Sequence, residues 1–155
     1  MTRNATANIM TIDVEDWFHI LEVEGGYTRE DWPGLEARVE ANTEVLLQLL
    51  SNSGATATFF VVGWVAAQQR ELIRRISNAG HELASHSFWH EVTDRHTRES
   101  LARDLSASKK FLEDLTGQEV LGFRAPGGSI RPDCAWAFDV LSEQGYRYDA
   151  SICPG

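Results

Sequence analysis

Three carboxylates lie within four residues near the start of the chain, at Asp13, Glu15 and Asp16. Like charges this close together repel one another unless a cation or a basic group compensates them. A cleft that binds a metal or moves protons provides that compensation, whereas an ordinary acidic loop is simply solvated by water. The three carboxylates alone therefore leave a functional site and a surface loop equally open.

Two histidines, His86 and His90, lie four residues apart in the segment HSFWH. Neutral imidazoles at this spacing, joined by a carboxylate, form the two-histidine, one-carboxylate set that Zn²⁺ favours when one coordination position stays open for water. A packed or surface histidine is the common alternative for either residue. His19 could reach the same place, but the sequence indicates no partner for it.

Arg124 and Trp89 have the chemistry to serve such a site. Arg124, in the segment FRAPGG, can pair with a carboxylate, fix its orientation and keep it ionised. Pro126 stiffens the loop after it. Trp89 stands between the two histidines, where its ring could bind a sugar, although tryptophans in a small domain more often serve packing.

The elements that must position these residues alternate along the chain. Short apolar segments rich in β-branched and aromatic residues predict strands at residues 8–13, 56–62, 82–85, 120–124 and 146–150. Helical spacing of apolar residues predicts helices at 34–50, 65–78 and 97–115, and a fourth between Pro132 and Gly145. Thr97 is a suitable N-cap, and Ser100 three residues later is not expected to complete a capping box with it.

Strands that alternate with helices predict an α/β fold with a parallel sheet, either a barrel or an open sheet. In both architectures the functional residues gather beyond the carboxyl ends of the strands. The acidic cluster, the histidine pair and Arg124 each follow a predicted strand. We therefore expect them to converge on one mouth of the sheet.

Composition excludes several classes of protein. The chain has 155 residues, 43% of them hydrophobic, and a net charge of −9, which disfavours nucleic acid or an anionic membrane as the main partner. No apolar run approaches the roughly 20 residues that span a bilayer, and the N-terminus does not read as a signal peptide, so a cytoplasmic protein is expected. Cys134 and Cys153 lie too far apart for a CxxC zinc site and are expected to be free thiols.

The ordered segments TIDVED, ATFFVVGWVA, HELASHSFWH, GFRAPGGS and GYRYDASICP resemble the successive motifs of the polysaccharide deacetylases. This is the NodB-homology group, also called carbohydrate esterase family 4. The resemblance runs from about residue 9 to the last residue, and the details are most similar to the DVED-type branch associated with exopolysaccharides. It implies a distorted (β/α) barrel and a divalent metal, expected to be Zn²⁺.

The resemblance also implies roles for individual residues. Asp13 matches the general base, Arg124 the arginine that holds the base, and Pro126 the proline that lines the groove. His86 and His90 match the two metal-binding histidines, and Trp89 is a candidate for substrate binding.

The third metal ligand is less clear, because the usual first motif is TFDDG and Val14 stands here where that motif has its metal carboxylate. Strand alternation places Glu15 on the face of Asp13, whereas a bend at the strand end would present Asp16. Asp16 is slightly favoured because its shorter side chain suits a preformed loop, but both alternatives stay open.

The implied function is metal-dependent hydrolysis of N-acetyl groups on an N-acetylated polysaccharide. Two alternatives are a related hydrolase of small amides, as in allantoin- and imide-processing relatives, and an inactive metal- or sugar-binding domain. A closed barrel usually takes about 200–250 residues. We therefore expect residues 1–155 to form the N-terminal part of the domain, an incomplete barrel of about five strands that lacks the family's late motifs and their acid histidine.

Overall fold

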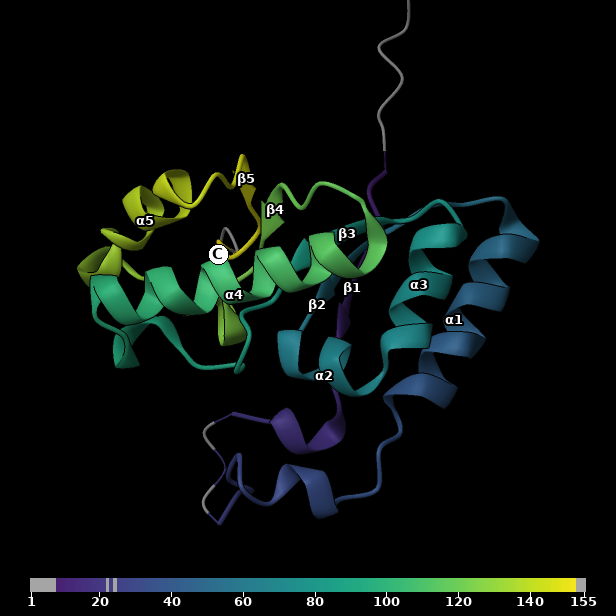
Figure 1. Ribbon diagram of the computed structural model, residues 1–155, viewed down its shortest axis with the longest axis horizontal. Helices are drawn as coiled ribbons and strands as arrows, with labels where there is room; N and C mark the ends of the chain where they lie inside the picture. The colour runs from purple at the N-terminus through teal and green to yellow at the C-terminus, as the bar shows by residue number, and fades with distance from the viewer. Residues whose placement is uncertain (1–7, 22, 24, 153–155) are drawn as a thin grey trace, which may run out of the picture.

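The computed structural model describes residues 8–21, 23 and 25–152. Its centre is a sheet of five parallel strands that pair in chain order (Figure 1). The strands are β1 (Thr11–Val14), β2 (Thr58–Val61), β3 (Glu82–Ser85), β4 (Gly122–Phe123) and β5 (Tyr148–Asp149). Parallel neighbours in unbroken chain order are the arrangement found in a (β/α) barrel, whereas a doubly wound sheet reverses its order. The predicted α/β class with a parallel sheet is confirmed.

The helices connect the strands and pack on one face of the sheet. They are α1 (Val39–Ser53), α2 (Gly63–Gln68), α3 (Arg70–Asn78), α4 (Arg98–Thr116) and α5 (Ala137–Glu143). Under them lies a core to which the strands contribute alternate residues, Val14, Phe59, Val61, Leu83 and Phe123. The residues between these point to the other face, where Asp13 is in register with Phe60 and Phe60 with Ala84. Asp13 therefore lies on the face that the helices leave uncovered.

The first helix begins later than its apolar spacing predicts. Residues 34–50 were expected to be helical, but the chain forms a 3-10 turn at Trp32–Gly34, is extended at Leu35 and becomes helical only at Val39. The reason is distant in sequence, because the carboxylate of Asp16 accepts hydrogen bonds from the backbone N–H groups of Arg38 and Val39. The helix also ends later than predicted, at Ser53, where Gly54 follows in the left-handed conformation at φ 64°.

Two further helix predictions are corrected. The predicted helix at residues 65–78 is two helices, α2 and α3, because the backbone leaves the helical region at Gln69 (φ −117°, ψ 50°). Ser100 does complete a capping box, since its N–H donates to the Thr97 hydroxyl and its hydroxyl accepts from the Thr97 N–H. A serine hydroxyl thus replaces the glutamate or glutamine usual at that position.

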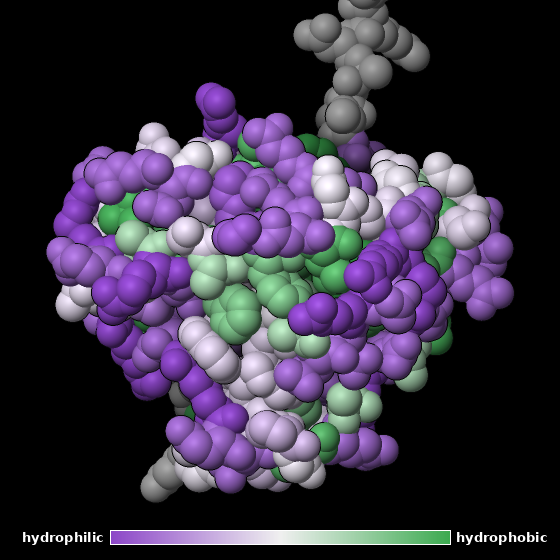
Figure 2. Space-filling model, viewed as in Figure 1, coloured by the Kyte–Doolittle hydropathy of each residue, from purple (hydrophilic) through white to green (hydrophobic). Residues whose placement is uncertain are grey.

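On the face seen in Figure 2, polar side chains predominate, and apolar ones gather where α2, α3 and α4 meet. Within the described residues, no helix is both long and apolar enough to cross a membrane. Cys134 is a buried free thiol, as expected, and Cys153 lies outside the described residues.

Gly63, the first residue of α2, offers a test of this packing. A Cβ at this position would lie 2.9 Å from Phe88 Cα and closer still to the Phe88 ring. Because backbone must then move, we expect Gly63→Ala to lower the free energy of unfolding by about 1–3 kcal/mol, measured by chemical denaturation. Gly34→Ala is the matched control, since no heavy atom lies within 4 Å of its added Cβ. Equal stabilities of the two variants would contradict the packing described.

Candidate active site

The three groups of polar residues that follow β1, β3 and β4 surround one cavity. It measures about 480 Å³, and its charged and imidazole lining consists of Asp13, Glu15, His19, His86, His90 and Arg124. Because parallel strands end at the same edge of a sheet, residues far apart in the sequence meet there. The structure thus brings together the side chains that the sequence placed at strand ends.

Arg124 holds Asp13 from across the sheet. Its Nη1 donates to Asp13 Oδ1 at 2.7 Å and its Nη2 donates to the Thr11 hydroxyl at 3.0 Å. Its Nε donates to the carbonyl of Ala150 at 3.2 Å, and its guanidinium lies 4.1 Å from the centre of the Phe60 ring. A guanidinium held at so many points presents a fixed positive charge to Asp13 and keeps that carboxylate oriented.

Glu15, His86 and His90 form a separate cluster in the same cavity. One potential ligand atom from each lies within 4.8 Å of the others. The Nδ1 of His86 lies 2.7 Å from the carbonyl oxygen of Arg124, which can only accept, so Nδ1 carries the proton and Nε2 keeps its lone pair. Metal-binding histidines characteristically make such a bond with their second nitrogen.

The protonation of this cluster suits a cation. Burial lowers the pKa of His86, so its imidazole is neutral near pH 7. Burial would raise the pKa of Glu15, but the neighbouring His90 outweighs this and the pKa is lowered. Glu15 Oε2 lies 2.7 Å from His90 Nε2, and the buried His90 Nδ1 has no hydrogen-bond partner among the described residues. Two imidazoles and one carboxylate at this spacing fit a divalent metal such as Zn²⁺.

Asp16 does not join the cluster. The slight preference for Asp16 over Glu15 as the third metal ligand assumed a carboxylate that points into the site, and the structure shows another direction. Asp16 is 5% exposed and turns toward the start of α1. Both oxygens accept backbone hydrogen bonds, from Trp17 at 3.0 Å, Arg38 at 2.9 Å and Val39 at 3.1 Å. A carboxylate already bound to several N–H groups is committed to holding the loop.

His19, for which the sequence indicated no partner, is buried in the wall of the cavity. Its Nδ1 accepts a hydrogen bond from the Asp16 N–H at 2.8 Å, and its ring centre lies 5.6 Å from that of His90. Burial lowers the pKa of His19 to about 4, so the ring is neutral with its proton on Nε2. The available signal was the spacing of three residues between Asp16 and His19, which closes a 3-10 turn.

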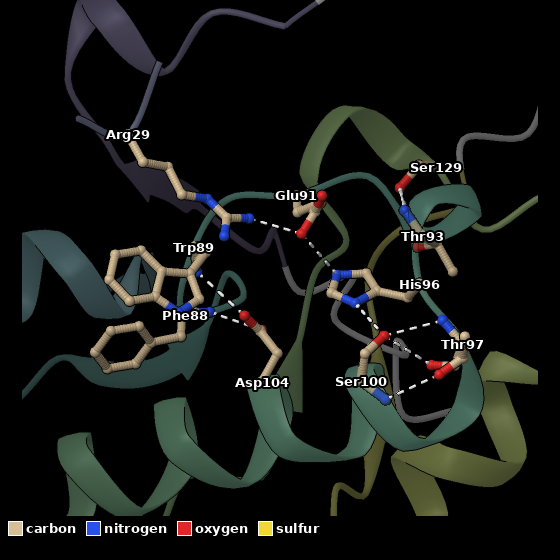
Figure 3. Close-up of polar contacts among 10 residues, drawn as sticks. All are labelled: Arg29, Phe88, Trp89, Glu91, Thr93, His96, Thr97, Ser100, Asp104 and Ser129. Atoms are coloured by element: carbon tan, nitrogen blue, oxygen red, sulfur yellow. Dashed lines mark hydrogen bonds and ion pairs between the residues drawn. The ribbon is translucent and has the colours of Figure 1, made fainter. Parts of the chain in front are cut away.

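The two residues expected to bind substrate are placed differently from each other. Trp89 is 39% exposed and lines a second cavity of about 410 Å³, which shares His19 and His90 with the first. The guanidinium of Arg29, paired with Glu91 at 2.6 Å, lies 5.2 Å from the centre of the Trp89 ring (Figure 3). Pro126 is buried, and its neighbours Ala125, Gly127 and Gly128 line the first cavity in its place.

Comparison with known proteins assigns the chain to a family. The model of the polysaccharide deacetylase family matches residues 26–148, well over half of the chain, so the chain belongs to this family and the resemblance is confirmed. The peptidoglycan-N-acetylglucosamine deacetylase of Bacillus cereus is 32% identical over 105 residues, covering 68% of this chain and 47% of that protein. The peptidoglycan deacetylase of Helicobacter pylori is 30% identical over 138 residues, covering 83% and 44%.

A family 4 carbohydrate esterase from Bacillus anthracis shares the fold. It superposes with a TM-score of 0.68 at 23% identity and covers 92% of this chain and 57% of that one. The chain spans less than half the length of the two curated relatives. The family match includes His86, His90 and Arg124, whereas Asp13 and Glu15 precede it. Membership of the DVED-type branch stays a prediction.

His19 leads to a prediction about pH. Its pKa of about 4 in the folded protein is below the unfolded value near 6.5, so the unfolded chain takes up the proton first. Above about pH 6.5 the imidazole is neutral in both states, and the stability that depends on keeping it neutral is fully present. As the pH falls toward 4, only the unfolded chain gains the proton, and the free energy of unfolding falls by about 3 kcal/mol. We expect the unfolding free energy of metal-free protein to fall less over this range in His19→Asn, which keeps an acceptor for the Asp16 N–H.

Chemical denaturation at several pH values measures this difference. Glu15 and His86 also titrate, but they do so in both proteins, so the difference between the two curves comes chiefly from His19. Parallel curves for wild type and His19→Asn would contradict the buried neutral imidazole.

Proposed function

We propose that the chain is the metal-dependent catalytic part of a hydrolase that removes N-acetyl groups from an N-acetylated polysaccharide. The observation that carries the proposal is the convergence of the Asp13–Arg124 pair and the Glu15, His86 and His90 cluster on one cavity. Membership of the polysaccharide deacetylases supports the reaction class, and the name of the Bacillus cereus relative supports N-acetylglucosamine as the acetylated sugar.

Glu15, His86 and His90 would hold the metal, which when bound supplies a Lewis acid and lowers the pKa of water near it. Asp13 is the general base in this proposal, because its carboxylate lines the same cavity and is 33% exposed, so a water molecule can reach it. Arg124 holds that carboxylate in a fixed orientation until it takes the proton. Gly127 and Gly128 also line this cavity, and in the proposal the acetyl group lies beside them.

The space around the site favours a polymeric substrate over a small amide. The cavity that contains Asp13 and the cavity beside Trp89 share His19 and His90, so they adjoin. The second cavity offers exposed aromatic surface on Tyr27 and Trp89 and the charged pair of Arg29 and Glu91. Aromatic faces with paired donors and acceptors suit a pyranose ring. A chain of sugars could thus extend beyond the acetylated residue.

The base can be tested with chito-oligosaccharides as substrate. We expect the zinc-loaded chain to release acetate and Asp13→Asn to lower the rate by about 10²–10⁴-fold, because the amide cannot accept the proton. Acetate is measured by a coupled enzymatic assay. Asp139→Asn is the control, since Asp139 is exposed on α5. An unchanged rate in Asp13→Asn would exclude Asp13 as the base, and zinc binding without any acetate release would favour a binding domain.

The third metal ligand can be tested by comparing two neighbouring carboxylates. We expect Glu15→Gln to weaken zinc binding by at least about 10–100-fold, since even the outer partners of metal ligands matter to this extent. Asp16→Asn should leave zinc binding unchanged but lower the unfolding free energy by about 1–3 kcal/mol, because charged hydrogen bonds at the start of α1 are lost. Titration against a chromophoric chelator measures the first effect, and denaturation the second. The reverse result would restore Asp16 as the ligand.

A further inference from the structure

The turn that joins the two histidines has an unfavourable backbone. Ser87 and His90 adopt positive φ angles, 66° and 52°, in the left-handed region that favours glycine. Such conformations persist only where surrounding contacts over-determine them. The contacts that hold residues 87–90 are therefore part of what places His90 beside His86, with ring centres 5.0 Å apart.

One side of this turn is held by the start of α2. The Gly63 N–H donates to the carbonyl of Ser87 at 2.9 Å, and the Trp64 N–H donates to the carbonyl of Phe88 at 2.9 Å. These bonds fix the carbonyl groups of the turn. Its N–H groups point elsewhere and need a different acceptor.

That acceptor is Asp104, in the middle of α4. The N–H of Phe88 donates to Asp104 Oδ2 at 2.8 Å, and the N–H of Trp89 donates to Asp104 Oδ1 at 3.2 Å (Figure 3). One carboxylate thus binds the two consecutive N–H groups that lie between the histidines. The turn is held between α2, through its carbonyls, and α4, through its N–H groups.

Burying the Asp104 carboxylate in α4 costs folding free energy. This cost indicates that Asp104 has a role beyond the stability of α4. It is 6% exposed, and no lysine, arginine or histidine among the described residues forms an ion pair with it. Aspartate is a weak helix former, and a buried carboxylate without a cation loses solvation. An apolar residue would fill this position on the buried face of α4 at lower cost, but it could not accept the two N–H groups.

We propose that Asp104 is a positioning residue for the metal centre, whose carboxylate holds the turn at residues 87–90 so that His90 faces His86 and Glu15 before any metal binds. The inference rests on the proposed metal site, to which it adds a residue that touches neither metal nor substrate. It explains why a carboxylate fourteen residues after His90 is buried under the turn. Preorganised ligands bind a metal more tightly than ligands that must first be ordered.

The test compares two aspartates of the same helix. We expect Asp104→Asn to weaken zinc binding by about 10–100-fold in titrations against a chromophoric chelator, the effect typical of outer partners of metal ligands. Asp114→Asn is the matched control, because Asp114 is an exposed α4 aspartate that pairs with Lys110. A folded Asp104→Asn protein with wild-type zinc affinity would overturn the proposal, even if its melting temperature were lower. That result would assign Asp104 a merely structural role.

A second measurement needs no variant and no metal. In metal-free wild type, the amide hydrogens of Phe88 and Trp89 should exchange slowly with solvent, because Asp104 already holds them. Exchange as fast as in an unstructured peptide would overturn the proposal, and slow exchange supports it even where Asp104→Asn fails to fold. Wild type that binds no zinc while these amides stay protected would contradict the proposed metal function but not the role of Asp104 in holding the turn.

Discussion

The ion pair between Asp13 and Arg124 is the contact on which the rest of the site depends, because it joins strands that are not neighbours. Arg124 follows β4, and its side chain crosses over Phe60 of β2 to reach Asp13 and Thr11 of β1. Its own carbonyl meanwhile binds the Nδ1 of His86. One residue therefore orients the carboxylate with its side chain and sets the tautomer of a histidine with its backbone. A displacement of Arg124 would disturb both halves of the site together.

The three carboxylates at the end of β1 illustrate how like charges are accommodated. Each has a different counterpart, since Asp13 pairs with Arg124, Glu15 contacts His90, and Asp16 accepts N–H groups at the start of α1. The three negative charges are thus separated in direction, and each is balanced locally. The fold thus gives each of the three neighbouring carboxylates its own partner and its own function.

The sequence predicts well what depends on neighbouring residues. The strand at 82–85 agrees with the prediction, because the apolar pattern of a strand is a local property. The start of α1 and the direction of Asp16 escaped it, since each depends on the other across more than twenty residues. The burial of Pro126 could not be read from its loop sequence either. Side-chain direction at a strand end is decided by tertiary partners, which periodicity does not reveal.

Three of the buried polar atoms that lack a partner lie close together in the described structure. They are His90 Nδ1, His19 Nε2 and Trp32 Nε1, and their side chains adjoin one another. Elsewhere in the chain polar groups do find partners. The strands of the sheet pair with one another, and the Asp16 carboxylate accepts hydrogen bonds from three N–H groups. Leaving donors and acceptors unmet is costly, so their concentration beside Asp13 and Arg124 indicates that stability is given up there for a ligand that binds. The same argument explains why the turn at residues 87–90 keeps a strained backbone: the fold holds these groups ready at the expense of their own conformational preference.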